Sequence, residues 1–178
     1  MLTLNDQVGQ FILKYKKWHN VTIEQLLDQT SGISDYINTK DWWLKVNAAT
    51  KAGKVFSLED LLNVAYEQPN NFPAGTKWEY SNTNYVLLGL ILEQVTHKSM
   101  KALMADLIKQ AGLANTYYLP QIYSAAIMQR ISHGYGHYDK IYDVTKVNGS
   151  WAHTSGAIVS TPEDLATWMH ILFNVSIV

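Results

Sequence analysis

Apolar residues recur at spacings of three and four along most of this chain, which is the periodicity of helices that bury one face. The pattern is clearest over 82–95, where Tyr85, Leu88, Leu92 and Val95 fall on one side of a helix. The chain is therefore predicted to be mainly α-helical. Other stretches with this period, or with residues that open a helix, are 4–15, 23–29, 57–67, 99–111 and the stretch that begins at Thr161.

Cap residues set the expected helix boundaries. Thr22 precedes the stretch 23–29, and Gln25 stands at the third helical position of a capping box. Ser57 opens its stretch in the same way. Pro162 lies in the first turn of the last helix, where the N–H that proline lacks would have no helical partner.

A short β-hairpin is the expected exception to the helical pattern. Residues 134–138 and 141–144 form two short aromatic and β-branched runs, separated by Asp139 and Lys140. The sequence contains no repeat, linker or low-complexity segment. Residues 1–178 are therefore expected to form one helical lobe.

The residues that suggest chemistry are Tyr80 and Asn82, at the start of the longest apolar helix. A tyrosine hydroxyl acts as a general base only where a neighbouring cation lowers its pKa from about 10. An asparagine amide can bind a substrate carbonyl or orient a lysine. Ser81, between the two, is a candidate substrate-binding residue. A turn followed by a helix N-cap explains the same three letters, so the motif alone leaves both interpretations open.

Three segments, taken in order, resemble the serine β-lactamase and penicillin-binding protein superfamily. Residues 21–33 (VTIEQLLDQTSGI) resemble its T-I-x-x-L-L-x-H-T-S-G-[IL] segment, and residues 72–85 (FPAGTKWEYSNTNY) are similar to its F-x-P-G-x-x-x-x-Y-S-N-x-x-Y stretch. Residues 156–165 (GAIVSTPEDL) resemble its G-G-[LI]-x-S-T-x-x-D-[LM] segment. The likeness is greatest to the class C branch, with its D-alanyl-D-alanine carboxypeptidases and related esterases.

The resemblance implies both a reaction and a fold. In the family, a serine attacks an acyl carbonyl and water later releases the covalent acyl-enzyme. By the resemblance, Tyr80 and a lysine would move the proton, and Asn82 would hold the substrate amide and that lysine. The implied fold is the helical lobe of the serine β-lactamase-like fold, without most of its α/β sheet domain. A peptide or small-molecule acyl substrate, no cofactor and a location outside the cytoplasm are implied as well.

The chain also departs from the family pattern. Gln29 stands at the usual histidine, and Ala157 replaces the second glycine of the late segment. No serine is followed three residues later by lysine, so the Ser-x-x-Lys nucleophile motif is missing. The Lys-Thr-Gly or His-x-Gly motif, which follows the late segment in the family, is missing too. The HTSG run at 153–156 resembles it but precedes the late segment, so it is not counted as this motif. We therefore expect part of a larger hydrolase, inactive alone, in which Tyr80 titrates near its ordinary value.

Composition narrows the possible partners. A net charge of −1 provides no basic field for nucleic acid. Charged residues make up 16% of the chain, below the roughly 25% of ordinary domains. A surface so poor in charge suggests that part of it is covered. In the fold that the resemblance implies, one face of this lobe packs on the α/β sheet domain, so the isolated lobe is expected to expose an apolar patch and to self-associate. The longest apolar run, around 85–92, is too short for a membrane span of roughly 18 residues.

A metal site is considered and not expected. His133 and His137 are four residues apart, but Gly134 and Gly136 disfavour a helix that would present both rings on one face. No acidic third ligand is evident from the sequence.

An aromatic group offers a second candidate for substrate binding. Trp42 and Trp43, with Tyr36 nearby, could form an aromatic wall of a ligand cleft. Packing of an amphipathic helix explains the same pair. Both interpretations stay open at the level of sequence.

A second class of function is compatible with the same sequence. Without a nucleophile, the chain could be a non-catalytic helical module derived from this fold, which binds a peptide, a glycan or another protein. The hydrolase hypothesis predicts that the residues encoded immediately upstream supply Ser-x-x-Lys, whereas the binding-module hypothesis predicts a natural start at Met1. The DNA that flanks this reading frame therefore separates the two.

Overall fold

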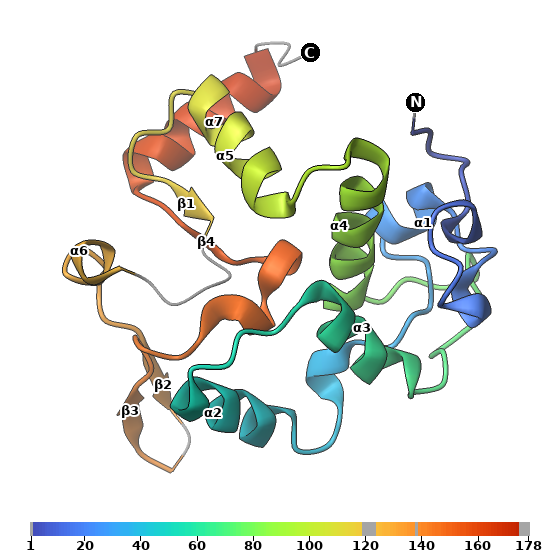
Figure 1. Ribbon diagram of the computed structural model, residues 1–178, viewed down its shortest axis with the longest axis horizontal. Helices are drawn as coiled ribbons and strands as arrows, with labels where there is room; N and C mark the ends of the chain where they lie inside the picture. The colour runs from blue at the N-terminus through green and yellow to red at the C-terminus, as the bar shows by residue number, and fades with distance from the viewer. Residues whose placement is uncertain (1, 119–123, 138, 175–178) are drawn as a thin grey trace.

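Helices dominate the residues that the computed structural model describes, which are 2–118, 124–137 and 139–174. Figure 1 shows these helices joined by loops, with two small sheets on the left-hand side of the view. The predicted mainly α fold is confirmed. The α-helices are α1 (Ile23–Leu27), α2 (Trp42–Ala52), α3 (Leu58–Tyr66), α4 (Asn82–Thr96), α5 (Met100–Gln110), α6 (Ala125–Met128) and α7 (Pro162–Asn174).

The strands of the described residues form two antiparallel pairs. β1 (Tyr117–Tyr118) pairs with β4 (Ile158–Val159). β2 (Tyr135–His137) pairs with β3 (Ile141–Asp143), which confirms the predicted hairpin. Such short pairs cannot form a separate sheet layer, so the core of the lobe is built by helices.

α4 is the central helix of that core. It contacts α1, α3, α5 and two 3-10 turns, η3 (Tyr36–Asn38) and η5 (His153–Ser155). Val86, Leu87 and Ile91 on α4 are completely buried. Full burial of one such side chain stabilises the folded state by about 1.5–3 kcal/mol, so α4 makes a large contribution to the stability of the lobe.

The prediction of a helix over 4–15 is wrong. The structure has only the 3-10 turn η1 (Val8–Gln10) in that stretch, and the N–H of Val8 donates to the carbonyl of Val21 at 2.9 Å. An α-helix over this stretch would use the N–H of Val8 for a bond to the preceding turn. Because that N–H is bonded to a distant segment instead, no α-helix forms here despite the helical spacing of the apolar residues. The apolar period still identifies the buried side chains, which are Val8, Ile12 and Tyr15.

The predicted caps are confirmed where they are local. Gln25 N donates to Thr22 Oγ1 at 3.2 Å, and Thr22 N donates to Gln25 Oε1 at 3.1 Å, which makes the reciprocal capping box of α1. Ser57 and Asp60 form the same arrangement at α3. Pro162 opens α7. Each cap satisfies backbone donors that the first helical turn leaves free.

Gly89 allows η5 to lie directly against α4. A Cβ at this position would come within 2.5 Å of Thr154 Cγ2 and 2.7 Å of Thr154 Oγ1. Thr154 is itself fixed, because its hydroxyl donates to the carbonyl of Tyr85 at 2.9 Å. The glycine is therefore required by close packing.

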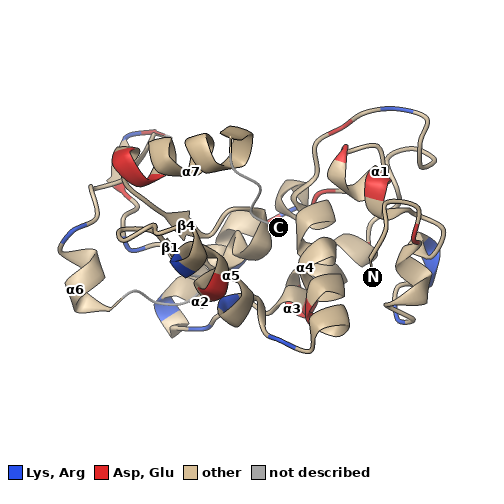
Figure 2. Cartoon of the chain, turned by 90° about the horizontal axis from the view of Figure 1, so that it is seen from above, with Lys and Arg blue, Asp and Glu red and all other residues tan. Residues whose placement is uncertain are grey.

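Charged residues are spread over the lobe. Figure 2 shows acidic and basic residues interspersed along the chain. Within the described residues, no helix has the length and apolar character needed to cross a bilayer. The absence of a nucleic-acid partner stays a prediction.

Gly89→Ala should lower the free energy of unfolding. Overpacking against Thr154 costs about 1–3 kcal/mol, which exceeds the gain of about 1 kcal/mol that alanine brings to a helix interior. Urea unfolding followed by circular dichroism measures the difference. Gly134→Ala is the control, because the nearest atom to its added Cβ, Val144 Cγ2, is 3.7 Å away. A Gly89→Ala protein more stable than the parent would contradict this packing.

Candidate active site

The site begins where the extended chain at 79–81 turns into α4. Ser81 is the N-cap residue of α4 and has extended backbone angles. Tyr80, just before it, is 47% exposed, and its hydroxyl donates to Asn82 Oδ1 at 3.4 Å. A phenol and an amide oxygen therefore lie side by side at the surface end of a buried helix.

Asn82 is hydrogen-bonded to the buried carboxylate of Asp35. Asp35, which is 6% exposed, accepts through Oδ2 from Asn82 Nδ2 at 2.7 Å and from Asn82 N at 3.1 Å. Its other oxygen accepts from Ile37 N at 3.2 Å. The carboxylate also lies at the positive end of the α4 dipole, which favours a negative charge there. Asp35 was not predicted from the sequence.

Gln29 joins the first sequence segment to the second. Its Oε1 accepts from Ser81 N at 2.9 Å and from Asn84 Nδ2 at 2.6 Å. Asn84 Oδ1 in turn accepts from the Ser31 hydroxyl at 2.6 Å. These buried bonds connect the residues of the Thr-Ser-Gly segment to the start of α4. The residue that replaces the family's usual histidine therefore has a defined task in this structure.

Gly32 completes this junction. Its φ is +69°, and a Cβ would lie 2.0 Å from the carbonyl oxygen of Phe72. Only glycine fits that position. The first segment is thereby placed directly against 72–85, the stretch that carries the tyrosine and the asparagine.

The residues just before the late segment reach the same helix from the other side. Tyr36 Oη donates to the carbonyl of Trp151 at 2.7 Å, and Thr154 donates to the carbonyl of Tyr85. Ala157, which follows, is buried in the core. All three sequence segments therefore meet around α4.

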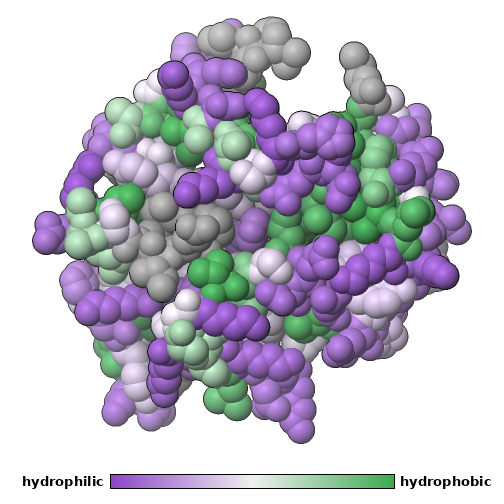
Figure 3. All heavy atoms as spheres, in the orientation of Figure 1, coloured by the Kyte–Doolittle hydropathy of each residue, from purple (hydrophilic) through white to green (hydrophobic). Residues whose placement is uncertain are grey.

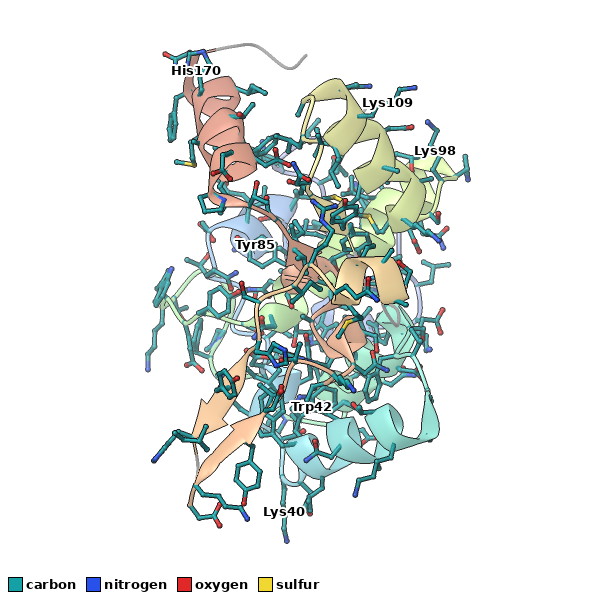
Figure 4. All side chains as sticks on the ribbon, turned by 90° about the vertical axis from the view of Figure 1, so that its left-hand side faces the viewer. Lys40, Trp42, Tyr85, Lys98, Lys109 and His170 are labelled. Carbon is teal, nitrogen blue, oxygen red and sulfur yellow. The ribbon has the colours of Figure 1, made fainter. Side chains whose placement is uncertain are left out.

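Two of the predicted substrate-binding residues lie in the interior. Ser81 is 2% exposed, and its hydroxyl faces the inside of the lobe. Trp42 is 1% exposed, and its ring packs 5.1 Å from that of Tyr36 and 5.4 Å from that of Phe56. Burial of both side chains favours the packing interpretation, and a role of either one in substrate binding stays a prediction. Figure 4 labels Trp42, the first residue of α2.

Trp43 lies on the other face of α2. It is 45% exposed, and its ring is 5.1 Å from that of Trp151. Both rings line a cavity of about 820 Å³, together with Tyr142, Val144 and other residues of the hairpin and the late segment. A role of Trp43 in substrate binding stays a prediction, and this cavity is where the side chain would act.

A smaller cavity of about 190 Å³ lies closer to Tyr80. Tyr85 and His153 line it, and the ring of Tyr85 is 6.5 Å from that of Tyr80. Figure 4 shows Tyr85 in the middle of the lobe. Residues 156–158 line both cavities, so the late segment separates them. The sequence offered no signal for this arrangement.

The pKa of Tyr80 is raised above its ordinary value. Partial burial is the main cause, and the neighbouring Tyr85 and Asp35 act in the same direction. The expectation that this phenol titrates near its usual pKa is therefore wrong for this structure. A protonated phenol donates a hydrogen bond, and it becomes a base only where a cation offsets the nearby negative charge.

The histidines near the hairpin do not form a cluster of ligands. His133 Nδ1 is 2.8 Å from Asp143 Oδ2, and His137 lies on β2. Among the residues that the structure describes, no three His, Cys, Asp or Glu side chains are arranged to hold a metal ion.

Gln29→Leu should destabilise the lobe by about 1–3 kcal/mol. The change leaves the N–H of Ser81 and the amide of Asn84 buried without their acceptor. Chemical unfolding measures the loss. Gln94→Leu, on the exposed side of α4, is the matched control and should change stability by no more than about 0.5 kcal/mol. Equal effects of the two substitutions would argue against the junction.

Burial of His153 makes the lobe sensitive to acid. Burial lowers the pKa of His153 from 6.5 to about 4. The histidine is therefore neutral in the folded state, and its contribution to stability is present above pH 6.5 and lost as the pH falls to about 4. Stability measured across that interval should decline less in His153→Asn, because asparagine tolerates the positive φ of this position.

Tyr118→Phe is the control for this pH dependence. Tyr118 Oη lies 2.8 Å from His153 Nδ1, and removing this hydroxyl leaves the ring of His153 half-buried. The variant should keep the parent's decline, since burial is the cause of the low pKa. A flat profile in the parent protein would contradict the burial of a neutral histidine.

Comparison with known proteins places this geometry in a family. The family model described as Beta-lactamase matches residues 1–177. Protein flp from Staphylococcus aureus (strain NCTC 8325 / PS 47) is 29% identical over 180 residues, which is 97% of this chain and 34% of that protein. A D-aminopeptidase from Cereibacter sphaeroides is 35% identical over 88 residues, which is 49% of this chain and 16% of the relative.

The fold is shared with a solved structure as well. The D-stereospecific amidohydrolase from Streptomyces sp. superposes with a TM-score of 0.87 and 26% identity, over 96% of this chain and 53% of that one. The chain thus spans about a third of flp and about half of this amidohydrolase. The family match over almost the whole sequence, together with the three segments that meet at α4, shows that the chain belongs to the β-lactamase family, within the superfamily of serine β-lactamases and penicillin-binding proteins.

Proposed function

We propose that this chain is the helical part of a serine hydrolase that works through an acyl-enzyme, and that it forms no acyl-enzyme by itself. The observation that carries the proposal is the contact between Tyr80 Oη and Asn82 Oδ1 at the exposed end of α4. The sequence contains no Ser-x-x-Lys, so the attacking hydroxyl and the partner ammonium would come from outside these 178 residues.

The chemistry assigns a step to each group. The serine oxygen bonds to the acyl carbon, its proton passes through Tyr80 or the lysine to the leaving group, and the bond to the leaving group breaks. Water then attacks the acyl-enzyme and releases the acid. Asn82 would hold the substrate amide and the lysine. The ammonium would bring the raised pKa of Tyr80 down, so that the phenolate becomes available as a base.

The names of the relatives support one class of substrate. One relative is a D-aminopeptidase and another is a D-stereospecific amidohydrolase. We therefore place amides of D-amino acids first, ahead of D-alanyl-D-alanine cell-wall peptides, β-lactams and esters. In this scheme, the large cavity beside Trp43 would receive the substrate side chain.

The absence of acylation is tested with a labelled penicillin and a fluorophosphonate. The purified 178-residue chain should form no stoichiometric adduct with either reagent, because it lacks the nucleophile motif. Intact mass spectrometry measures the adduct. A stable one-to-one adduct on this chain would overturn the proposed inactivity.

The role of Tyr80 is tested in the product of the complete natural gene. Tyr80→Phe should lower kcat/KM for a D-amino acid amide by about 10²–10⁴-fold, which is the usual contribution of a general acid or base. Tyr135→Phe, at an exposed tyrosine on the hairpin, is the control and should leave activity unchanged. Unchanged hydrolysis in Tyr80→Phe would refute the function proposed for this site.

We further propose that the isolated chain self-associates through α7. Leu165, Met169, Leu172 and Phe173 recur at helical spacing, and all four side chains are exposed. Figure 3 shows further apolar surface on the right-hand side of its view. Pairing with the same stripe of a second copy removes this apolar surface from water, which favours association.

Light scattering at increasing concentration tests this proposal. The parent chain should form dimers or larger species, and the double variant Leu172→Lys with Phe173→Lys should be monomeric, because the two ammonium groups interrupt the apolar stripe. Leu13→Lys, at another exposed leucine, is the control and should not change the assembly. A monodisperse monomer of the parent chain at high concentration would contradict self-association.

A further inference from the structure

We infer that Asp35 is a positioning residue, whose carboxylate fixes the amide of Asn82 so that its oxygen, and not its nitrogen, faces Tyr80. The inference rests on the proposed function of Tyr80 and Asn82 and goes beyond it, because it assigns a task to a residue outside the three-residue motif. Asp35 lies 47 positions before Asn82 in the sequence.

The argument starts from the donors and acceptors of the two groups. An ionised carboxylate only accepts hydrogen bonds, whereas an asparagine amide has one acceptor oxygen and one nitrogen with two protons. Asn82 Nδ2 lies 2.7 Å from Asp35 Oδ2. Turning the amide by 180° would bring Asn82 Oδ1 against that carboxylate, with two acceptors in contact. The charge of Asp35 therefore selects one orientation of the amide.

Asp35 is itself fixed in place. Its Oδ1 accepts from Ile37 N, and its Oδ2 accepts a second bond from Asn82 N. On either side, Thr83 Oγ1 donates to the carbonyl of Ser34 and accepts from Tyr36 N, at 2.7 and 3.3 Å. The backbone around the carboxylate is thus bonded directly to the first turn of α4, so the pair cannot shift independently.

The orientation of the Asn82 amide decides which atoms the site exposes to a ligand. With the nitrogen held by Asp35, Asn82 Oδ1 faces outward and lies 3.4 Å from Tyr80 Oη. Two oxygen atoms then stand together at the surface, an arrangement that accepts bonds from an ammonium or a substrate N–H. The buried negative charge also contributes to the raised pKa of Tyr80, which keeps the phenol protonated until a cation arrives.

Nuclear magnetic resonance of the 178-residue chain tests this inference. In the parent protein, the side-chain amide protons of Asn82 should exchange with water more slowly than those of Asn47, an exposed asparagine on α2. Asp35→Ala should remove that protection. Asp35→Asn should lower the pKa of Tyr80, read from the ring carbon shifts and assigned with Tyr80→Phe, because the charge is gone.

A matched variant separates positioning from general stability. Ser57→Ala removes the cap of α3 and destabilises the lobe at a distance from the site. It should leave both the exchange of the Asn82 amide and the titration of Tyr80 unchanged. If Ser57→Ala moves these signals as much as the Asp35 variants do, Asp35 is merely structural and the inference fails.

Amide exchange in the parent chain tests the inference even if the Asp35 variants do not fold. Exchange of the Asn82 amide as fast as that of Asn47 in the parent would overturn the inference, and so would an Asn82 amide that stays protected in folded Asp35→Ala. Both signals are measured without catalysis. If they behave as expected while Tyr80→Phe leaves hydrolysis intact, the proposed function fails and the orienting contact of Asp35 remains.

Discussion

The structure depends on how the N-terminal end of α4 is held. The first N–H groups of a helix have no partner within it, and here they are bonded by side chains from another segment. Gln29 accepts from Ser81 N, and Asp35 accepts from Asn82 N. The same two contacts fix the backbone that carries Tyr80 and Asn82. Stability of the lobe and geometry of the candidate site therefore have one physical origin.

This arrangement explains why the three sequence segments belong together. Gln29 of the Thr-Ser-Gly segment and Asp35 just after it supply the acceptors, and the second segment supplies the start of α4 and the phenol. The residues just before the late segment close the other side through Trp151 and Thr154. Glycine is needed at 32 and 89 because backbone or side-chain atoms of a neighbouring segment approach within about 3 Å of where a Cβ would lie. The family resemblance thus corresponds to a set of contacts around one helix.

The sequence predicted what is decided locally. The caps at Thr22 and Ser57 involve residues three positions apart, so they could be read from the chain, and the hairpin was recognised from its two short runs. The helix over 4–15 was predicted wrongly because a bond from Val8 to Val21 decides the backbone there. Periodicity also could not separate Trp42 from Trp43, since neighbours on a helix point to different faces.

The candidate site was predicted only in part, for the same reason. Tyr80 and Asn82 could be proposed because a motif joins them, whereas Asp35 is 47 residues away from its partner. An available signal was a carboxylate placed between the apolar residues Ile33 and Tyr36, where a buried charge requires partners. The raised pKa of Tyr80 likewise follows from burial and neighbours that only the folded chain brings together.

The most direct test of the account is a crystal structure of the complete natural gene product carrying a covalent phosphonate adduct. The central claim, that Tyr80 and Asn82 form half of a hydrolytic centre, predicts both side chains within hydrogen-bond distance, about 2.6–3.2 Å, of the adduct or of the lysine beside it. An adduct on a serine in another part of the protein, with Tyr80 and Asn82 facing only solvent, would contradict the claim.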